Sequence, residues 1–111
     1  MSAARDIDLT LAALADPHRR RAIELLGERP RRAGELAEAL GLAAPAMSRH
    51  LRVLKQGGLV AESHPASDAR VRVYALRHEA MDELKRWLEA AEAMWSAQLA
   101  AFKAHVERDP E

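Results

Sequence analysis

The sequence predicts a mainly α-helical fold with one small β-hairpin, in the order α-α-α-α-β-β-α. Three observations support this prediction. Apolar residues recur every three or four positions through most of the chain, which is the spacing of one helix face. An alternating pattern replaces that spacing only between residues 59 and 76. Proline and glycine residues separate the periodic segments at the points where helices begin and end: Pro17, Gly41, Pro45, Gly57 and Gly58.

The composition is that of a single globular domain, spanning residues 1–111. Hydrophobic residues make up 49% and charged residues 31%, which disfavours a disordered chain. The absence of cysteine excludes disulfides, cysteine nucleophiles, iron–sulfur clusters and thiolate zinc sites. With neither a secretory signal nor an apolar run of roughly 20 residues, we expect a soluble cytoplasmic protein. A domain this small has a limited core, so oligomerisation is an expected source of stability.

The first two helices are indicated by apolar spacing and by a start signal. The first is expected over residues 6–15, and its apolar residues lie three or four positions apart: Ile7, Leu11 and Leu14. Asp16 is a favourable cap for the second helix and Pro17 suits its first position, so this helix is expected to run from Pro17 to Glu28. Residues 29–32 are interpreted as a connector.

A short third helix and a longer fourth helix follow. The third is expected to end at Gly41, and its apolar residues are Leu36, Ala37 and Leu40. Pro45 opens the fourth helix, and the Gly57-Gly58 pair ends it. The buried stripe of the fourth helix is expected to be Met47, Leu51 and Leu54.

A hairpin and a long helix complete the chain. Residues 59–63 and 70–76 alternate and contain β-branched or aromatic residues, with a polar tip at residues 65–68. From residue 79 the helical spacing returns, and it predicts a helix of roughly 28 residues, about 40 Å long. A compact monomer of this size could not cover that length. The apolar stripe of this helix is Leu84, Leu88, Ala91, Trp95, Leu99, Phe102 and Val106.

The net charge of zero conceals a segregation of charge along the chain. Residues 17–72 hold eleven Lys or Arg and six Asp or Glu, a net charge of +5, and the two ends together carry −5. A basic segment attracts polyanions, of which nucleic acid is the commonest. On charge alone, a solvated surface with no such partner is an equally acceptable explanation.

Two short helices joined at Gly41-Leu42 and followed by a hairpin form a winged helix-turn-helix arrangement, here over residues 17–76. In that arrangement the second helix of the pair lies in the major groove of DNA. Its small residues allow a close approach, Arg49 suits guanine, and Ser48 or His50 suits a base or a phosphate. The hairpin suits the backbone or the minor groove. The candidate DNA-binding residues are Ala44, Ala46, Ser48, Arg49, His50, Arg52, Lys55, Arg70 and Arg72.

The order of these motifs resembles the ArsR family of bacterial repressors. Segments 35–42, 45–54 and 58–60 match that family's helix-turn-helix, residues 16–21 its second-helix opening, and Arg70-x-Arg72-x-Tyr74-x-Leu76 its wing. The resemblance covers nearly the whole chain. It implies a homodimeric winged-helix protein that represses transcription by binding an imperfect palindrome. It also implies that the first and last helices, residues 1–15 and 79–107, build the dimer interface.

Many members of that family release DNA when they bind a metal, but the metal ligands are missing here. The Cys-x-Cys pair of the third helix falls at about Arg32 and Gly34, and the last-helix ligands fall at His78, Ala80, Ala91 and Met94. No position keeps its ligand type in register, and no two of the five histidines are three or four residues apart. We therefore expect no metal site and no cofactor.

The apolar stripe of the last helix predicts pairing with a second subunit. Its pattern resembles a narrower subset of ArsR-like repressors, those encoded beside START-like (SRPBCC) ligand-binding proteins. Packing on the protein's own core is the alternative, and both hold if the helix is long enough. A pocket for a small-molecule effector between these helices also stays open. The candidate interface residues are Leu11, Trp87, Leu88, Trp95, Leu99 and Phe102.

Two hypotheses for the function therefore follow from the sequence. The first is a dimeric repressor that binds double-stranded DNA in a sequence-specific manner. The second is a winged-helix module that binds a protein partner and no DNA. The small, polar and basic surface expected for the fourth helix favours the first. An enzyme is not expected, since the chain has no glycine-rich phosphate loop and no nucleophile elbow at Ser48 or Ser96.

Overall fold

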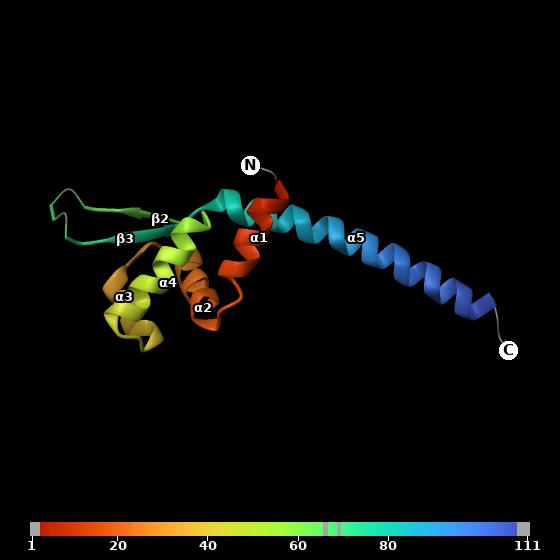
Figure 1. Ribbon diagram of the computed structural model, residues 1–111, viewed down its shortest axis with the longest axis horizontal. Coiled ribbons are helices and arrows are strands. Elements are labelled where there is room, and N and C mark those ends of the chain that lie inside the picture. Colours follow the sequence, from red (N-terminus) through yellow and green to blue (C-terminus); the bar gives the residue numbers. More distant parts are fainter. Residues whose placement is uncertain (1–2, 66, 69, 109–111) are drawn as a thin grey trace.

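The computed structural model describes residues 3–65, 67–68 and 70–108. The mainly helical fold is confirmed, with α1–α4 gathered into one body (Figure 1). The hairpin β2–β3 and the helix α5 extend from this body in opposite directions, and the principal extents are 72 × 31 × 21 Å. The elements in order are α1 (Ala3–Ala13), α2 (Pro17–Glu28), β1 (Arg31–Arg32), α3 (Ala33–Leu40), α4 (Ala44–Gln56), β2 (Val60–Ser63), β3 (Val73–Leu76) and α5 (His78–Arg108).

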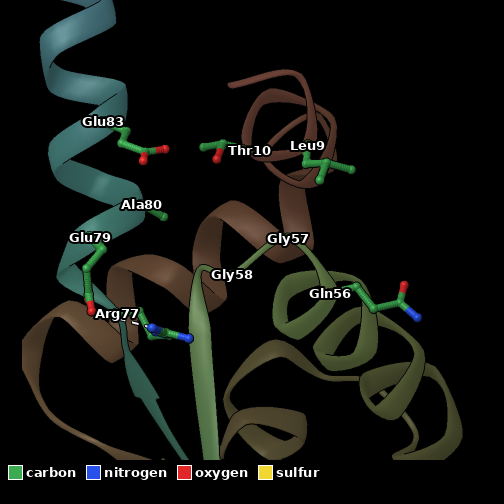
Figure 2. Close-up of a pocket in the computed structure, with 9 residues that line it drawn as sticks. All are labelled: Leu9, Thr10, Gln56, Gly57, Gly58, Arg77, Glu79, Ala80 and Glu83. Atoms are coloured by element: carbon green, nitrogen blue, oxygen red, sulfur yellow. Dashed lines mark hydrogen bonds and ion pairs between the residues drawn. The ribbon is translucent and has the colours of Figure 1, made fainter. Parts of the chain in front are cut away.

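Helix α5 joins the body through its first turns only. It lies against α1, and of its residues only Ala80 and Ala91 are buried. A hollow of about 200 Å³ opens where α1, the end of α4 and the start of α5 meet. Figure 2 shows Thr10 of α1 facing Ala80 and Glu83 of α5 across it. Among the residues that the structure describes, no helix is both long and apolar enough to cross a lipid bilayer.

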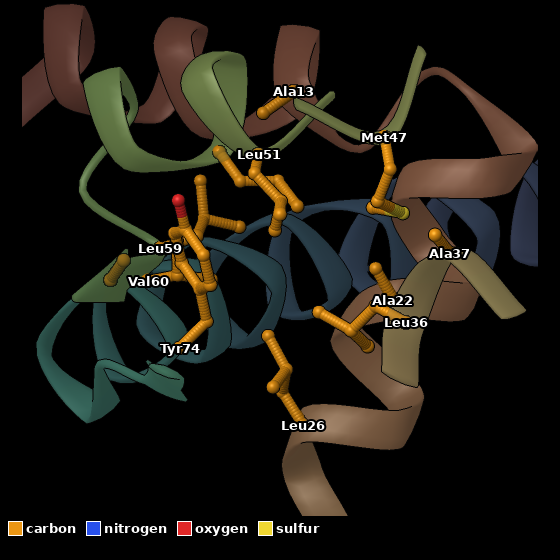
Figure 3. Packing of buried hydrophobic residues seen from close by; sticks show 12 residues of the cluster. Ala13, Ala22, Leu26, Leu36, Ala37, Met47, Leu51, Leu59, Val60 and Tyr74 are labelled. Carbon is orange, nitrogen blue, oxygen red and sulfur yellow. The ribbon is translucent and has the colours of Figure 1, made fainter. Parts of the chain in front are cut away.

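The core lies between α2, α3, α4 and the sheet (Figure 3). The expected stripe of the fourth helix is confirmed, because Met47, Leu51 and Leu54 are each at most 1% exposed. Leu36 of α3 and Tyr74 of β3 are buried in the same cluster. Burying a side chain of this size contributes about 1.5–3 kcal/mol, so this cluster fixes how α4 sits on the body.

The connector predicted at residues 29–32 is in part a strand. Arg31 and Arg32 form β1, which pairs antiparallel with β3, so the sheet has three strands in the order β1-β3-β2. The guanidinium of Arg31 helps to hold this strand, since it donates to the Leu25 carbonyl (3.1 Å) and to Glu28 (2.6 Å) at the end of α2. A two-residue strand has no period of its own, and it forms here because the chain passes beside β3.

The element boundaries differ slightly from the expected ones. Helix α1 lies three residues earlier at its start than predicted, and α5 begins at His78 rather than residue 79. The strands of the hairpin are shorter than the segments 59–63 and 70–76, because the ladder between β2 and β3 runs only from Val60↔Leu76 to Ser63↔Val73. Ala66, within the predicted hairpin tip, and Ala69, just after it, lie outside the described residues.

The turn between α3 and α4 depends on Gly41. This residue ends α3, as the sequence predicted, and it adopts the left-handed conformation (φ 67°), with its backbone N–H donating to the last carbonyls of α3. A β-carbon at this position would meet no atom within 4 Å, so only the backbone conformation disfavours another residue there.

We predict that Gly41→Ala lowers the free energy of unfolding by about 1–2 kcal/mol, the cost of placing an L-residue in the left-handed region. Gly27→Ala, near the end of α2, is the matched control. Its β-carbon also meets open space and its φ is not positive, so its stability should be unchanged or higher. Urea denaturation of the three proteins measures the difference. Equal stability of the two variants would contradict the strain argument.

Candidate nucleic-acid interface

Helix α4 presents an apolar face to the core and a polar face to solvent. Opposite the buried stripe, Ala44, Arg49, Arg52 and Lys55 are exposed, and Ala46, Ser48 and His50 are half-buried at its edges. The hydrogen bonds and ion pairs of the described residues engage Ser48, His50 and Lys55 but not Arg49 or Arg52. Of the seven helix residues predicted for DNA binding, Arg49 and Arg52 are thus exposed cations with no protein partner in the described chain.

One edge of that face is held by the hairpin. Arg72 donates from Nη2 to the Ser48 hydroxyl (3.1 Å) and from Nη1 to the Tyr74 hydroxyl (3.3 Å), and its guanidinium lies 5.9 Å from the centre of the Tyr74 ring. Arg72 is half-buried. It therefore ties the start of β3 to α4, a role that the sequence did not indicate, and its contact with DNA stays a prediction.

Lys55 is paired on the same side. Its Nζ donates to Glu62 Oε1 at 2.8 Å. This hydrogen bond raises the pKa of Lys55 and holds the pKa of Glu62 below its ordinary value, while burial raises the pKa of Tyr74 beside them. The charge of Lys55 is thus largely compensated within the chain, which makes it a weaker candidate for a DNA contact than Arg52.

The opposite edge of α4 faces α2. His50 Nδ1 lies 3.3 Å from Arg19 Nη1, and the rings of His50 and His18 are 5.6 Å apart and tilted. His50 therefore contacts protein at one ring nitrogen, a partner that the sequence analysis did not identify.

A further basic region was missed in the sequence. Arg32 joins Arg70 and Arg72 around a hollow of about 330 Å³ at the start of α3. Arg70 is highly exposed, and its backbone and Nε hydrogen bonds to Asp68 lower the pKa of that carboxyl. The arginines at positions 29, 31 and 32 were the available signal in the sequence. The segment was interpreted only as a connector, so its charge was not assigned to the interface.

The residues predicted for a dimer interface form an uncovered apolar surface on α1 and α5. Every one of the six is at least 39% exposed, from Leu11 on α1 to Leu99, which is 68% exposed, on α5. The structure adds Leu9, Met94 and Val106 to this surface. From residue 92 to residue 108, each residue of α5 is exposed. Of the predicted stripe, only Ala91 is buried and Leu84 is half-buried.

The described residues offer no metal centre. Within them, no three His, Asp or Glu side chains lie close enough together to hold a metal ion. Two of the histidines, His18 and His50, do approach each other, but two ligands do not make a metal site.

A protein-family model matches the segment that contains this interface. The model described as "Bacterial regulatory protein, arsR family" matches residues 16–62. This segment begins at the cap of α2 and ends in β2, so it contains α3 and α4.

Two curated relatives are regulators of transcription. The HTH-type transcriptional regulator Rv2034 of Mycobacterium tuberculosis (strain ATCC 25618 / H37Rv) is 45% identical over 71 residues, which cover 64% of this chain and 65% of the relative. The transcriptional repressor SdpR of Bacillus subtilis (strain 168) is 36% identical over 50 residues, covering 45% of this chain and 56% of that one. The chain thus matches less than two thirds of the length of either relative.

Two solved structures share the fold. An ArsR-like transcriptional regulator from Rhodococcus sp. RHA1 superposes with a TM-score of 0.75 and 29% identity, covering 91% of this chain and 92% of that one. The homodimeric winged helix-turn-helix DNA-binding domain Mb0332 from Mycobacterium bovis superposes with a TM-score of 0.64 and 24% identity, covering 82% and 83%. These similarities confirm the winged helix-turn-helix fold.

The Lys55–Glu62 pair predicts a specific loss of stability in acid. Because the pKa of Glu62 is lowered in the folded protein, its ionised form stabilises the fold above the unfolded pKa, and that contribution is lost as the pH falls through the folded pKa. Glu62→Gln should therefore be less stable than the parent at pH 7, and the gap should close toward pH 3. Urea denaturation at both pH values measures this gap. Glu38→Gln, an exposed control on α3, should show no such closing gap. A gap for Glu62→Gln that persists in acid would count against the pair.

Proposed function

The chain belongs to the ArsR family of bacterial transcriptional regulators, and from this premise we propose that it is a homodimeric repressor that binds a palindromic DNA operator through α4 and the hairpin β2–β3. The observation that carries the proposal is the exposed face of α4, where Arg49 and Arg52 have no protein partner among the described residues. Members of this family regulate transcription and are not enzymes.

We assign the residues of α4 to separate roles in this proposal. Arg49 donates to a guanine edge in the major groove, and Arg52 neutralises a phosphate. Ala44 and Ala46 let the helix start approach the duplex, and because Ala43 supplies no side-chain cap, the first N–H groups of α4 are available to a phosphate. Ser48 and His50 add polar contacts at the edges. Lys55 contributes least, since Glu62 already compensates its charge.

The hairpin contributes to affinity more than to sequence preference. Arg70 is exposed beside β3, and Arg72 and the newly identified Arg32 lie around the same hollow. Guanidinium groups arranged in this way bind backbone phosphates, which position a protein on DNA without reading its sequence. We propose that these three arginines extend the contact with DNA beyond α4.

The dimer rests on the apolar surface of α1 and α5. Its exposed residues are Leu9, Leu11, Trp87, Leu88, Met94, Trp95, Leu99, Phe102 and Val106. Exposed apolar side chains in this number are unfavourable in water and are usually covered by a partner. The similar Mycobacterium bovis domain is described as homodimeric, which supports a second copy as that partner. Two-fold symmetry then presents two copies of α4 to successive major grooves, about 34 Å apart.

The mode of action is proposed from the relatives and from the ligand chemistry. Repression is supported by the Bacillus subtilis relative, which is described as a transcriptional repressor. We propose that metal does not control DNA release, so that added zinc leaves operator binding unchanged.

If a small molecule acts as effector, the hollow between α1, α4 and α5 is the site that we propose for it, because it touches both the dimer helices and the end of α4. The protein would act in the cytoplasm, where its operator lies.

Selection from a random library of duplexes, followed by fluorescence anisotropy, tests the proposal. The expected result is a palindromic consensus, bound by two chains and strongly preferred over a scrambled duplex. Equal binding of both duplexes, weak and steeply dependent on salt, would show only a basic surface. No binding to either would favour a winged-helix module for a protein partner.

Arg49→Ala should weaken binding to the selected duplex about 5–150-fold, the equivalent of 1–3 kcal/mol for one guanine contact, and relax the preference at one base pair. Arg86→Ala is the matched control, because Arg86 is equally an exposed arginine on a helix but lies on α5. Anisotropy against the consensus and its single-base variants measures both effects. If the two variants bind alike, Arg49 does not read DNA.

Trp95→Glu should convert the dimer to monomer, since a carboxylate would have to be buried in an apolar interface. Ala93→Glu, also exposed and only two residues away on α5, points to a different side of the helix and should remain dimeric. Sedimentation equilibrium over a range of concentrations reports the state of each. A dimeric Trp95→Glu variant would exclude this stretch of α5 from the interface.

A further inference from the structure

The side chain of Arg19 reaches in two directions from α2. Its Nε and Nη2 donate to the carbonyls of Ala13 (2.6 Å) and Ala12 (3.3 Å) at the end of α1. Its Nη1 lies 3.3 Å from Nδ1 of His50, on the opposite side of the guanidinium and on α4. One planar group therefore touches a helix proposed for dimerisation and a helix proposed for DNA recognition.

The backbone that carries Arg19 is itself fixed. The Asp16 carboxylate accepts from the backbone N–H groups of His18 (2.8 Å) and Arg19 (3.2 Å), which closes the first turn of α2. The last carbonyls of a helix have no partner within it, and the guanidinium bonds two of them at the end of α1, of which Ala12 also accepts from the Ala15 N–H. Arg19 is thereby held at both its backbone and its side chain.

The contact with His50 has one possible direction as a hydrogen bond. A guanidinium has donors only, so His50 Nδ1 is the acceptor. The groups beside the ring are the Arg19 guanidinium, the His18 ring and, further off, the Asp16 carboxylate.

From this geometry we propose that Arg19 is a positioning residue: it couples α1 to α4, so that the dimer interface sets the spacing of the two recognition helices. The proposal rests on the proposed function. Helix α1 carries the exposed Leu9 and Leu11, and Arg19 bonds the same helix one to four residues beyond them. A change in how α1 packs on a second copy would move the Arg19 guanidinium, which is hydrogen-bonded to both helices. That movement would in turn shift His50.

The neighbouring arginine offers a matched control. Arg20 Nη1 donates to the Leu14 carbonyl at 2.8 Å, so Arg20 also holds the end of α1, but none of its hydrogen bonds in the described chain reaches α4. Lysine keeps the charge of either residue and lacks the planar fork needed to bond two helices at once. Arg19→Lys should break the coupling, and Arg20→Lys should not.

The test uses the full chain and the duplex that the parent selects from the random library. Three probes are compared: that duplex, the same duplex with two base pairs inserted between its half-sites, and a single half-site. The parent should bind the inserted duplex much more weakly than the selected one. Arg19→Lys should lose about 5–150-fold in affinity for the selected duplex and keep parental affinity for the half-site. It should also show a smaller insertion penalty, which is the ratio of the affinities for the selected and the inserted duplex. Arg20→Lys should match the parent on all three.

A second pair of variants leaves the end of α1 untouched. His50→Leu removes the acceptor and should reproduce the smaller insertion penalty of Arg19→Lys, with no further effect in the double variant. His50→Gln keeps an acceptor and should restore the parental penalty. Thermal unfolding checks that each protein is folded. If Arg19→Lys does not fold, the two His50 variants alone test the proposal.

Two results would overturn the proposal. A parental insertion penalty in His50→Leu would show that the contact does not set the spacing. Equal losses on the half-site and the full duplex would show that Arg19 or His50 acts only by touching DNA. If the parent selects no duplex at all, it is the proposed function that fails, which is a separate and distinguishable outcome.

Discussion

The burial of one face of α4 is the constraint on which the remaining features depend. Met47, Leu51 and Leu54 are almost completely removed from water, and together they set both the height and the rotation of the helix on the core. Because side chains leave a helix in fixed directions, this rotation also decides which residues face outward. Arg49 and Arg52 are exposed for this reason, and not because of any contact of their own. The packing of the buried face therefore determines which residues α4 presents to solvent.

The edges of α4 show a second level of control. On one side the hairpin reaches Ser48 through Arg72, and on the other α2 reaches His50 through Arg19. Both contacts use a guanidinium, which can bond two partners in one plane and stays charged at any physiological pH. Helix α4 is thus held on both sides by arginines of the basic middle segment, residues 17–72. Some of the positive charge that sequence composition suggests is available to DNA is instead used to hold the structure together.

The sequence predicted the helices well because each has a period that is visible within a single segment. The α4 stripe, the cap at Asp16 and the end of α3 at Gly41 depend on neighbouring residues alone, and the structure confirms them. The strand β1 could not be predicted in this way, because Arg31 pairs with Tyr74 across the body. The same limit applies to Arg72 with Ser48 and to Arg19 with His50, whose partners lie 24 and 31 positions apart. For the interface, residue types on α4 were predictable, whereas which cations are already engaged was not.

The outer part of α5 has a consequence for how long the protein persists in a cell. Residues 92–108 are all exposed, and a lone helix of this length is only marginally stable in water. With a second copy in place, its order increases with the concentration of the chain by mass action. At low abundance the segment would fray, and frayed backbone is the preferred substrate of proteases. The steady-state amount of the protein would then fall more than in proportion to its rate of synthesis.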